Sequence, residues 1–302
     1  MPEQPILIVI GGPTASGKTG LAIEVARHYD TEVLSADSRQ FYREMRIGNA
    51  RPTREELATV PHHFIADRSL DEPLTAGTYA EEALGVLDKL FQRRPVAVLA
   101  GGSGLYIRAL CEGLDDFPEI TEAARTQVQG LFLESGLAGL QAELRRLDPA
   151  YHAEVDLQNA RRLERALRVC YTAGKPYSSF LGKRPGRRFR SVYLQPAIDR
   201  ASLYDRINRR VETMLAEGLE AEARDLYPRR GQPVLETVGY QEWWPHFAGE
   251  YDRERAVELI KRNSRRYAKR QATWFRDYAA VTGLDGVIGH CSEPGRGPRG
   301  GW

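Results

Sequence analysis

The sequence has few cysteines and no long hydrophobic segment. Its 302 residues include three cysteines, Cys111, Cys170 and Cys291, which are odd in number and far apart. They supply neither a disulfide framework nor a CxxC metal half-site, so we expect a reducing, cytoplasmic setting. No apolar run approaches the roughly 20 residues that span a bilayer, which argues against a membrane segment. The residues before Ile6 include no basic residue, so we do not expect the short apolar run after them to be a signal peptide.

The overall composition is that of an ordinary globular protein. Hydrophobic residues make up 42% and charged residues 28%, which excludes collagen-like and wholly disordered chains. At roughly 150 residues per domain, the length allows two structural units. The net charge of +2 conceals two basic clusters, with seven Lys or Arg residues in Lys261–Arg276 and five in Lys183–Arg190. Such clusters attract phosphate backbones, although a single basic run is more often a solvated helix face.

Strands and helices alternate in the first part of the chain. The continuous apolar run at Ile6–Ile10 predicts a buried strand, and we expect a second strand at Glu32–Ala36 and a third, buried strand at Pro95–Ala100. Leu21–Tyr29 and Thr78–Phe91 have the apolar spacing of helices. This alternation predicts an α/β fold, in which a parallel sheet is flanked by helices.

The pattern changes after Gly113, where helices without strands predominate. We therefore divide the chain into a first part of the α/β core (1–113), an all-helical insertion domain (114–190), a continuation of the core (191–289) and a tail rich in Gly, Pro and Arg that we expect to be disordered (290–302). The expected helices of the insertion are Thr121–Ser135, Leu137–Leu147 and Asn159–Ala173. The continuation begins with a strand at Ser191–Leu194, and long amphipathic helices follow at about 201–227 and 252–279.

A phosphate-binding loop lies between the first strand and the first helix. Gly12, Pro13, Thr14, Ala15, Ser16, Gly17, Lys18 and Thr19 match the pattern GxxxxGK[ST]. In such a loop the glycines let backbone N–H groups converge on phosphate oxygens, and the following helix adds a partial positive charge. Lys18 would neutralise the terminal phosphates and Thr19 would ligate Mg²⁺. A glycine-rich turn with an incidental lysine is the weaker interpretation.

The loop indicates a polyphosphate ligand but not ATP hydrolysis. Nucleoside triphosphatases carry an acidic residue at a strand end that helps to hold Mg²⁺. Here the strand ending at Ala100 runs into Gly101-Gly102-Ser103-Gly104. The acid at a strand end is Asp37, whose carboxylate would lie beside the phosphate-binding loop at the carboxyl edge of a parallel sheet. A metal ligand, a general base and a helix cap are all open roles for it.

Several motifs, taken together and in order, resemble those of the tRNA dimethylallyltransferases. The segments that carry this resemblance are Gly12–Thr19, Ser35–Tyr42, Pro61–His63, Gly101–Tyr106, Asn159–Leu167, Val238–Tyr240 and Tyr267–Arg276. The resemblance spans about residues 6 to 285. It implies transfer of a dimethylallyl group from dimethylallyl pyrophosphate to the exocyclic amine of the adenosine just 3′ of a tRNA anticodon, with release of pyrophosphate.

The resemblance also implies roles for particular residues. The phosphate-binding loop would hold the donor's pyrophosphate with Mg²⁺ on Thr19, and Asp37 would be the catalytic base. The positions that match tRNA contacts of the family are Asp37, Ser38, Arg39, Gln40, Ser103, Arg125, Arg161, Arg162, Leu163, Glu164, Arg165, Arg266, Lys269 and Arg270. The clustered arginines could instead form surface ion pairs with Glu164 or other acids. We expect the tRNA anticodon stem-loop as the macromolecular partner of a monomeric protein without an obligate protein partner.

Other interpretations remain open at this stage. An isopentenyltransferase acting on free adenine nucleotides would have less use for the helical insertion. A small-molecule or nucleotide kinase would consume ATP, and an RNA-binding P-loop NTPase would bind tRNA without transferring a group. His62 and His63 are adjacent in an extended segment, where side chains point in opposite directions, so we expect a structural role and no metal site.

Overall fold

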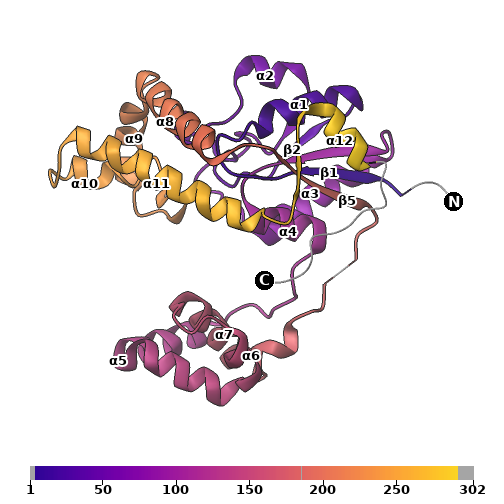
Figure 1. The fold of residues 1–302 in the computed structure, drawn as a ribbon. Coiled ribbons are helices and arrows are strands. Elements are labelled where there is room, and N and C mark those ends of the chain that lie inside the picture. The colour runs from indigo at the N-terminus through magenta and orange to yellow at the C-terminus, as the bar shows by residue number, and fades with distance from the viewer. Residues whose placement is uncertain (1–3, 185, 292–302) are drawn as a thin grey trace. The chain divides into compact units, whose positions relative to one another are not determined.

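The computed structural model describes residues 4–184 and 186–291, which form two compact units (Figure 1). The first unit combines the chain up to Cys111 with the chain from Arg187 onward, and the second is Glu112–Gly186. We expected the helical insertion to extend to residue 190, but residues 187–190 belong to the first unit because Arg190 begins a strand of its sheet. Of the expected tail, residues 292–302 lie outside the described residues, whereas residues 290 and 291 complete helix α12 (Gly283–Cys291).

The first unit contains a parallel sheet with the strand order β3-β2-β4-β1-β5-β6. The strands are β1 (Ile6–Ile10), β2 (Val33–Ser35), β3 (His62–His63), β4 (Val96–Ala100), β5 (Arg190–Pro196) and β6 (Ala279–Val281). The predicted α/β class is thus confirmed. The sequence did not predict β3 and β6, which lie at the two edges of the sheet and are too short to show a strand period.

Helices cover both faces of the sheet (Figure 1). On one face, Ile8, Ile10 and Val98 pack with apolar residues of α1 (Lys18–His28) and α12. Figure 1 shows α3 (Ala76–Phe91) and α4 (Gly104–Glu112) on the other side. Leu7, Val9 and Leu99 are also fully buried, as expected of strands with both faces covered. A short helix, α2 (Arg54–Thr59), precedes β3.

A group of helices extends from the sheet after β5. They are α8 (Arg200–Ala216), α9 (Leu219–Leu226), α10 (Trp243–Phe247) and α11 (Arg253–Trp274). The helix expected over 201–227 is divided at Gly218, whose φ of 99° is left-handed. The helix expected over 252–279 ends at Trp274, and the chain then enters β6. Ala268 of α11 packs with Leu203 and Ile207 of α8 against the phosphate-binding loop.

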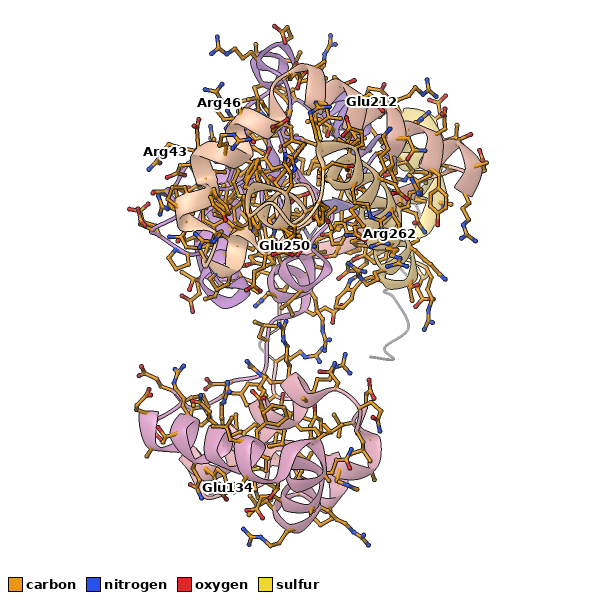
Figure 2. The ribbon with its side chains drawn as sticks, turned by 90° about the vertical axis from the view of Figure 1, so that its left-hand side faces the viewer. Arg43, Arg46, Glu134, Glu212, Glu250 and Arg262 are labelled. Atoms are coloured by element: carbon orange, nitrogen blue, oxygen red, sulfur yellow. The ribbon has the colours of Figure 1, made fainter. Side chains whose placement is uncertain are left out.

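The second unit is entirely helical in its regular structure. It contains α5 (Glu122–Leu147), α6 (Pro149–Glu154), α7 (Ala160–Ala173) and a 3₁₀ turn at Tyr177–Phe180. Two helices were expected where α5 lies, and α5 does break its helical geometry at Gly136, where φ is 58°. Leu140 and Leu144 of α5 pack on Leu163 and Leu167 of α7. Glu134 of α5 is exposed on its surface (Figure 2), and so are the neighbouring hydrophobic side chains of Phe132 and Leu133.

No helix in residues 4–184 or 186–291 is both long enough and apolar enough to cross a bilayer.

Candidate active site

The phosphate-binding loop has the expected place between β1 and α1. Gly12 and Gly17 adopt φ values of 138° and 96°, and even Ala15 is held at 64°. With these left-handed backbone conformations the loop curves around its own backbone N–H groups, which is the geometry of a phosphate-binding nest. Lys18 begins α1, and its ammonium group donates to the Pro13 carbonyl at 2.7 Å. The Ser16 hydroxyl is buried and has no hydrogen-bond partner among the described residues.

Two cations and one carboxylate gather over this loop. The pKa of Lys18 is lowered to about 8, mainly by burial, while Asp37 opposes this shift and Arg210 adds to it. Arg210 of α8 lies 3.4 Å from the Thr14 hydroxyl through its Nη1 atom. Desolvation lowers the pKa of Arg210 as well, although part of the side chain remains open to solvent. Two cations therefore lie beside Asp37 at the loop, and Glu56 and Glu217 also border the cavity there.

Asp37 follows β2 and takes part in an Asx turn, in which its Oδ1 accepts the Arg39 amide at 3.2 Å. The neighbouring β4 ends at the same edge of the sheet, since the Ala36 amide donates to the Ala100 carbonyl at 2.8 Å. The Ser103 hydroxyl accepts the Ser38 amide at 2.9 Å. The 101–104 motif therefore holds the Asp37 segment in place.

The glycines of that motif are explained by close packing. A Cβ on Gly101 would lie 2.8 Å from the Cα of Ala36 and closer still to its carbonyl group. On Gly102 it would overlap the amide of Gln271, and on Gly104 the indole of Trp274. Glycine at these positions thus lets the Asp37 segment and α11 approach β4.

Gln271 joins three parts of the site. Its Oε1 accepts the Thr14 amide at 2.9 Å, and its Nε2 donates to the Gly102 carbonyl at 3.0 Å. The side chain is buried, and both its amide oxygen and its amide nitrogen are hydrogen-bonded within the protein. α11 is thereby fixed to the phosphate-binding loop.

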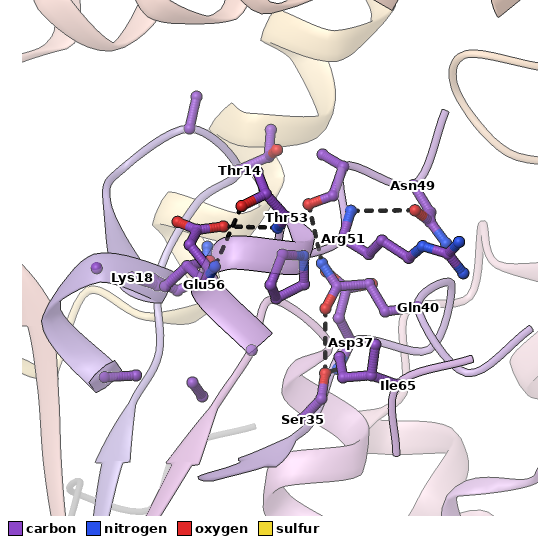
Figure 3. Close-up of a pocket in the computed structure, with 18 of the residues that line it drawn as sticks. Thr14, Lys18, Ser35, Asp37, Gln40, Asn49, Arg51, Thr53, Glu56 and Ile65 are labelled. Carbon is purple, nitrogen blue, oxygen red and sulfur yellow. Dashed lines mark hydrogen bonds between the residues drawn. The ribbon is translucent and has the colours of Figure 1, made fainter. Parts of the chain in front are cut away.

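Asp37 lines two cavities of the first unit. The larger, of about 410 Å³, is bordered by the phosphate-binding loop, by the segment from Arg46 to Thr53 and by one side of α8 (Figure 3). The smaller, of about 90 Å³, lies against Tyr267 and Gln271 of α11 and against Gly239. Thr14, Asp37 and Arg210 border both cavities, so the carboxylate lies where the two meet.

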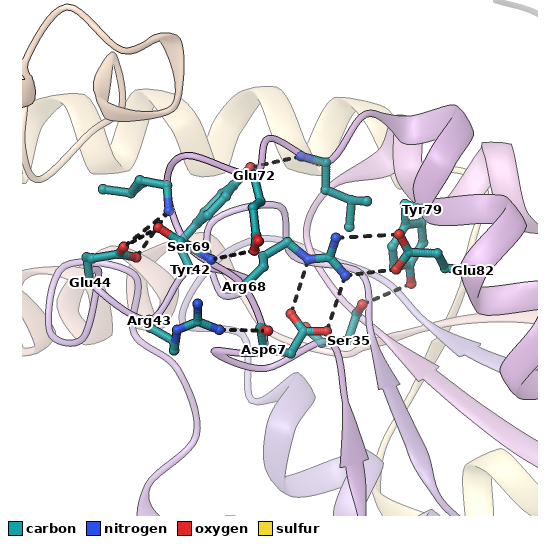
Figure 4. Close-up of polar contacts among 12 residues, drawn as sticks. Ser35, Tyr42, Arg43, Glu44, Asp67, Arg68, Ser69, Glu72, Tyr79 and Glu82 are labelled. Atoms are coloured by element: carbon teal, nitrogen blue, oxygen red, sulfur yellow. Dashed lines mark hydrogen bonds and ion pairs between the residues drawn. The ribbon is translucent and has the colours of Figure 1, made fainter.

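Polar contacts of Tyr79 and Arg68 hold the chain between Ser35 and Arg43 (Figure 4). The Tyr79 hydroxyl donates to the Ser35 carbonyl at 2.9 Å, and Tyr79 itself is fully buried. Arg68 pairs with Glu82 at 2.8 Å, and its own carbonyl accepts the Arg43 amide at 3.0 Å. Within the segment, Gln40 accepts the Ser35 hydroxyl at 3.2 Å (Figure 3).

The two histidines have local partners. His63 Nε2 lies 2.6 Å from Glu32, and His62 Nδ1 lies 2.8 Å from the Val60 carbonyl. Burial lowers the pKa of His62, which also borders the larger cavity. Among the described residues there is no group of three or more His, Cys, Asp or Glu side chains able to hold a metal.

The residues predicted to contact RNA lie in both units. In the helical unit, Arg125, Arg161, Arg162 and Arg165 are exposed. Arg165 stacks 5.2 Å from the Phe117 ring centroid, and Glu164 pairs with Arg168 at 2.7 Å. Leu163 is fully buried in the core of this unit, so its side chain is not available to RNA and we leave it out of the proposed surface.

In the first unit, Arg266, Lys269 and Arg270 of α11 are exposed. Other cations of the same basic run have partners, since Lys261 pairs with Glu212 and Arg265 donates to Asn208 at 2.6 Å.

Three features of the site were not predicted from the sequence. They are Arg210, the bridging role of Gln271 and the segment 46–51. Arg210 lies almost 200 residues from Thr14 along the chain, and no local pattern connects the two. Gln271 was part of a quoted motif, but its role depends on a contact with Gly102 that only the fold reveals.

The fold and this site define an α/β protein in which the loop with the P-loop sequence pattern and the Asp37 carboxylate border the same cavity. The family model described as IPP transferase matches residues 40–278. A tRNA dimethylallyltransferase of Christiangramia forsetii is 49% identical over 271 residues, which cover 89% of this chain and 90% of the relative. The chain therefore belongs to the IPP transferase family, and the resemblance inferred from the motifs is confirmed.

Solved structures agree with this assignment. The crystal structure of a tRNA isopentenylpyrophosphate transferase from Bacillus halodurans is 36% identical, with a TM-score of 0.66, and the match covers 93% of this chain and 90% of that one. A eukaryotic dimethylallyltransferase acting on tRNA matches with a TM-score of 0.75 over 89% of this chain and 69% of that one. At 24% identity, this second likeness supports the fold alone.

Proposed function

We propose that this protein transfers a dimethylallyl group from dimethylallyl pyrophosphate to the exocyclic amine of the tRNA adenosine adjacent to the 3′ side of the anticodon, releasing pyrophosphate. The observation that carries the proposal is the position of Asp37, which borders both cavities next to the phosphate-binding loop. A donor held on the loop and an adenine entering from the other cavity would meet at this carboxylate.

The donor's pyrophosphate would bind to the loop. Lys18 and Arg210 supply positive charge, and the start of α1 directs backbone amides at the same place. The buried hydroxyl of Ser16 is an unpaired polar group that a phosphate oxygen would satisfy. Negative charge grows on the pyrophosphate as the allylic C–O bond breaks, so these groups would stabilise the transition state more than the ground state.

Asp37 would act as the general base. The lone pair of an adenine amine is delocalised into the ring, so the amine is a weak nucleophile unless its proton is removed as the new bond forms. In the transfer step, the adenine amine nitrogen would form a bond to the allylic carbon and the C–O bond to pyrophosphate would break. The amine proton would pass to the Asp37 carboxylate. The Asx turn with Arg39 and the hydrogen bond between Ser38 and Ser103 would hold the base in position.

The residues present fit a Mg²⁺ ion that arrives with the donor. Thr19 borders the larger cavity with one hydroxyl, and Mg²⁺ commonly combines one or two protein ligands with substrate phosphate oxygens. When bound, the ion would neutralise charge on the leaving pyrophosphate. The chain's own part is to offer the Thr19 hydroxyl next to Lys18.

The exposed arginines of the helical unit and the exposed cations of α11 would bind the phosphates of the anticodon stem-loop. We expect each unit to contribute such contacts to one tRNA, with the protein acting as a monomer. A tRNA substrate also agrees with the cytoplasmic location expected from the cysteines.

Mass spectrometry of nucleosides from unmodified tRNA, incubated with the protein, Mg²⁺ and dimethylallyl pyrophosphate, tests the proposal. A dimethylallyl adduct on the adenosine beside the anticodon is the expected result. Modification of free adenine nucleotides in preference to tRNA would support the alternative acceptor. ATP turnover without any adduct would instead support an RNA-binding P-loop NTPase or a kinase.

A further inference from the structure

Glu222 of α9 binds three consecutive backbone amides of the segment that borders the larger cavity. Its carboxylate accepts the amides of Arg46 at 2.9 Å, of Ile47 at 2.9 Å and of Gly48 at 3.0 Å. The Tyr240 hydroxyl also donates to this carboxylate, at 2.7 Å. Four donors on one side chain make a charge-assisted cluster, which is stronger and more directional than isolated neutral hydrogen bonds.

The anchored segment continues into residues that shape the site. The Asn49 side chain donates to the carbonyl groups of Arg39, at 3.1 Å, and of Met45. The Gln40 amide donates to the Ala50 carbonyl at 3.2 Å (Figure 3). The segment that Glu222 holds is therefore bonded twice to the strand exit that carries Asp37.

The opposite side of the larger cavity belongs to α8, which supplies Arg210, Thr213 and Met214, and to Glu217 directly after it. Only Glu217 and Gly218 separate α8 from α9, and Glu222 lies in the first turn of α9. The carboxylate thus connects the helical side of the cavity to the side formed by residues 46–53. The distance between these two sides limits the width of the space available to a ligand.

Packing around Tyr240 keeps this connection rigid. Tyr240 is fully buried, and a Cβ on Gly48 would lie 2.5 Å from its ring, so the ring and the segment are in direct contact. Burial and the adjacent Glu222 carboxylate raise the pKa of Tyr240 well above its usual value, so the hydroxyl remains a donor at neutral pH. Gly239, before it, adopts a φ of 99° that brings the tyrosine into this position.

We propose that Glu222 is a positioning residue that sets the width of the donor cavity and thereby selects a five-carbon prenyl chain over longer ones. The inference rests on the proposed function, because it assumes that the larger cavity holds the donor. Glu222 does not border the cavity itself and acts through the backbone of residues 46–48.

The test compares Glu222→Gln with Glu220→Gln in the full-length protein. Glu220 lies on the same helix but pairs with Arg224 and Arg253 at the surface, so its loss should leave the kinetics unchanged. In Glu222→Gln the side-chain NH₂ would face at least one backbone N–H group, and the segment would lose part of its attachment. Each variant would be assayed with unmodified tRNA and two donors, dimethylallyl pyrophosphate and a ten-carbon allylic pyrophosphate. Calorimetry with inorganic pyrophosphate would report on the loop alone.

We expect Glu222→Gln to raise KM for the five-carbon donor about tenfold with a smaller change in kcat, and to reduce the preference for this donor by a similar factor. Pyrophosphate affinity should stay unchanged. A purely structural role would lower kcat with the active fraction and leave KM and the donor preference unaltered, and that result would overturn the proposal.

If Glu222→Gln does not fold, Tyr240→Phe removes one hydrogen bond from the same carboxylate and keeps the three amide bonds. It should shift KM and donor preference in the same direction by roughly threefold, and unaltered values would reject the inference. Failure of the wild-type protein to modify tRNA would count against the proposed function, whereas identical kinetics for the two glutamate variants would count against Glu222 alone.

Discussion

Replacing Gly101 with alanine should damage catalysis by displacing Asp37. The new methyl group would lie 2.8 Å from the Cα of Ala36, whereas carbon atoms in contact are ordinarily about 3.5 Å or more apart. The overlap with the Ala36 carbonyl is more severe, so the backbone must move by roughly 1 Å. Ala36 cannot move freely, because its amide and carbonyl bond to Ala100 and Ser103. The displacement would therefore reach Asp37, the next residue.

The expected loss follows from the geometry of the reaction. A misplacement of about 1 Å in an active site can reduce the rate about 100-fold. Overpacking of this kind costs about 1–3 kcal/mol of stability, which is less than the 5–15 kcal/mol typical of a folded domain. Gly101→Ala should therefore remain folded while losing most of its single-turnover rate at saturating donor.

Gly85→Ala provides the matched control. Gly85 lies within α3, is exposed, and leaves open space within 4 Å of the position that an added methyl group would take. Alanine should therefore stabilise the helix by about 1 kcal/mol and leave the rate unchanged. The assay is rapid-quench measurement of prenylated tRNA, accompanied by thermal unfolding of each variant. A folded Gly101→Ala protein with the wild-type rate would refute the role assigned to this close contact.

Four other changes test the site. Asp37→Asn should retain tRNA binding but lower kcat by about 10²–10⁴-fold in a nucleoside assay, and unchanged turnover would remove Asp37 as the base. In the proposed function the protonated form of Lys18 would bind pyrophosphate, and its pKa is lowered to about 8, so KM for the donor should rise as the pH increases through 8; a flat profile from pH 7 to 9 would contradict this role. Arg210→Gln should raise KM for the donor about tenfold in the same assay, through loss of a charge-assisted contact, and an unaltered KM would exclude that contact. Neutralising Arg266, Lys269 and Arg270 of α11 together should lower the slope of log Kd for tRNA against log salt concentration by about 2. An unchanged slope would place RNA binding elsewhere.

Local patterns in the sequence were sufficient to predict the four central strands of the sheet and its phosphate-binding loop. Ile6–Ile10 is an uninterrupted apolar run, and the glycines after it can adopt the left-handed conformations that a tight loop requires. The position of Asp37 also followed from a general rule, because the carboxyl ends of parallel strands meet at one edge. These inferences needed only neighbouring residues and the period of each element.

The missed features depend on contacts between distant segments. Arg210 reaches Thr14 only because α8 and α11 pack together against the loop. Leu163 was predicted to contact RNA because it lies among arginines in the sequence. Its position on α7 instead directs its side chain into the core of the helical unit. A motif identifies which residues matter, but the helix face on which each one lies decides whether it touches a ligand or the core.

The glycine that follows β4 has a physical consequence for the chemistry. A carboxylate at that strand end commonly helps to hold Mg²⁺ in enzymes that hydrolyse nucleoside triphosphates. In this protein the absence of side chains at Gly101 and Gly102 lets the Asp37 segment and Gln271 pack directly against β4. Asp37 therefore follows the neighbouring strand β2 and borders a second cavity as well as the loop. A carboxylate in that position can accept a proton from a second substrate, as the proposed reaction requires, in which a pyrophosphate bound at the loop would be the leaving group.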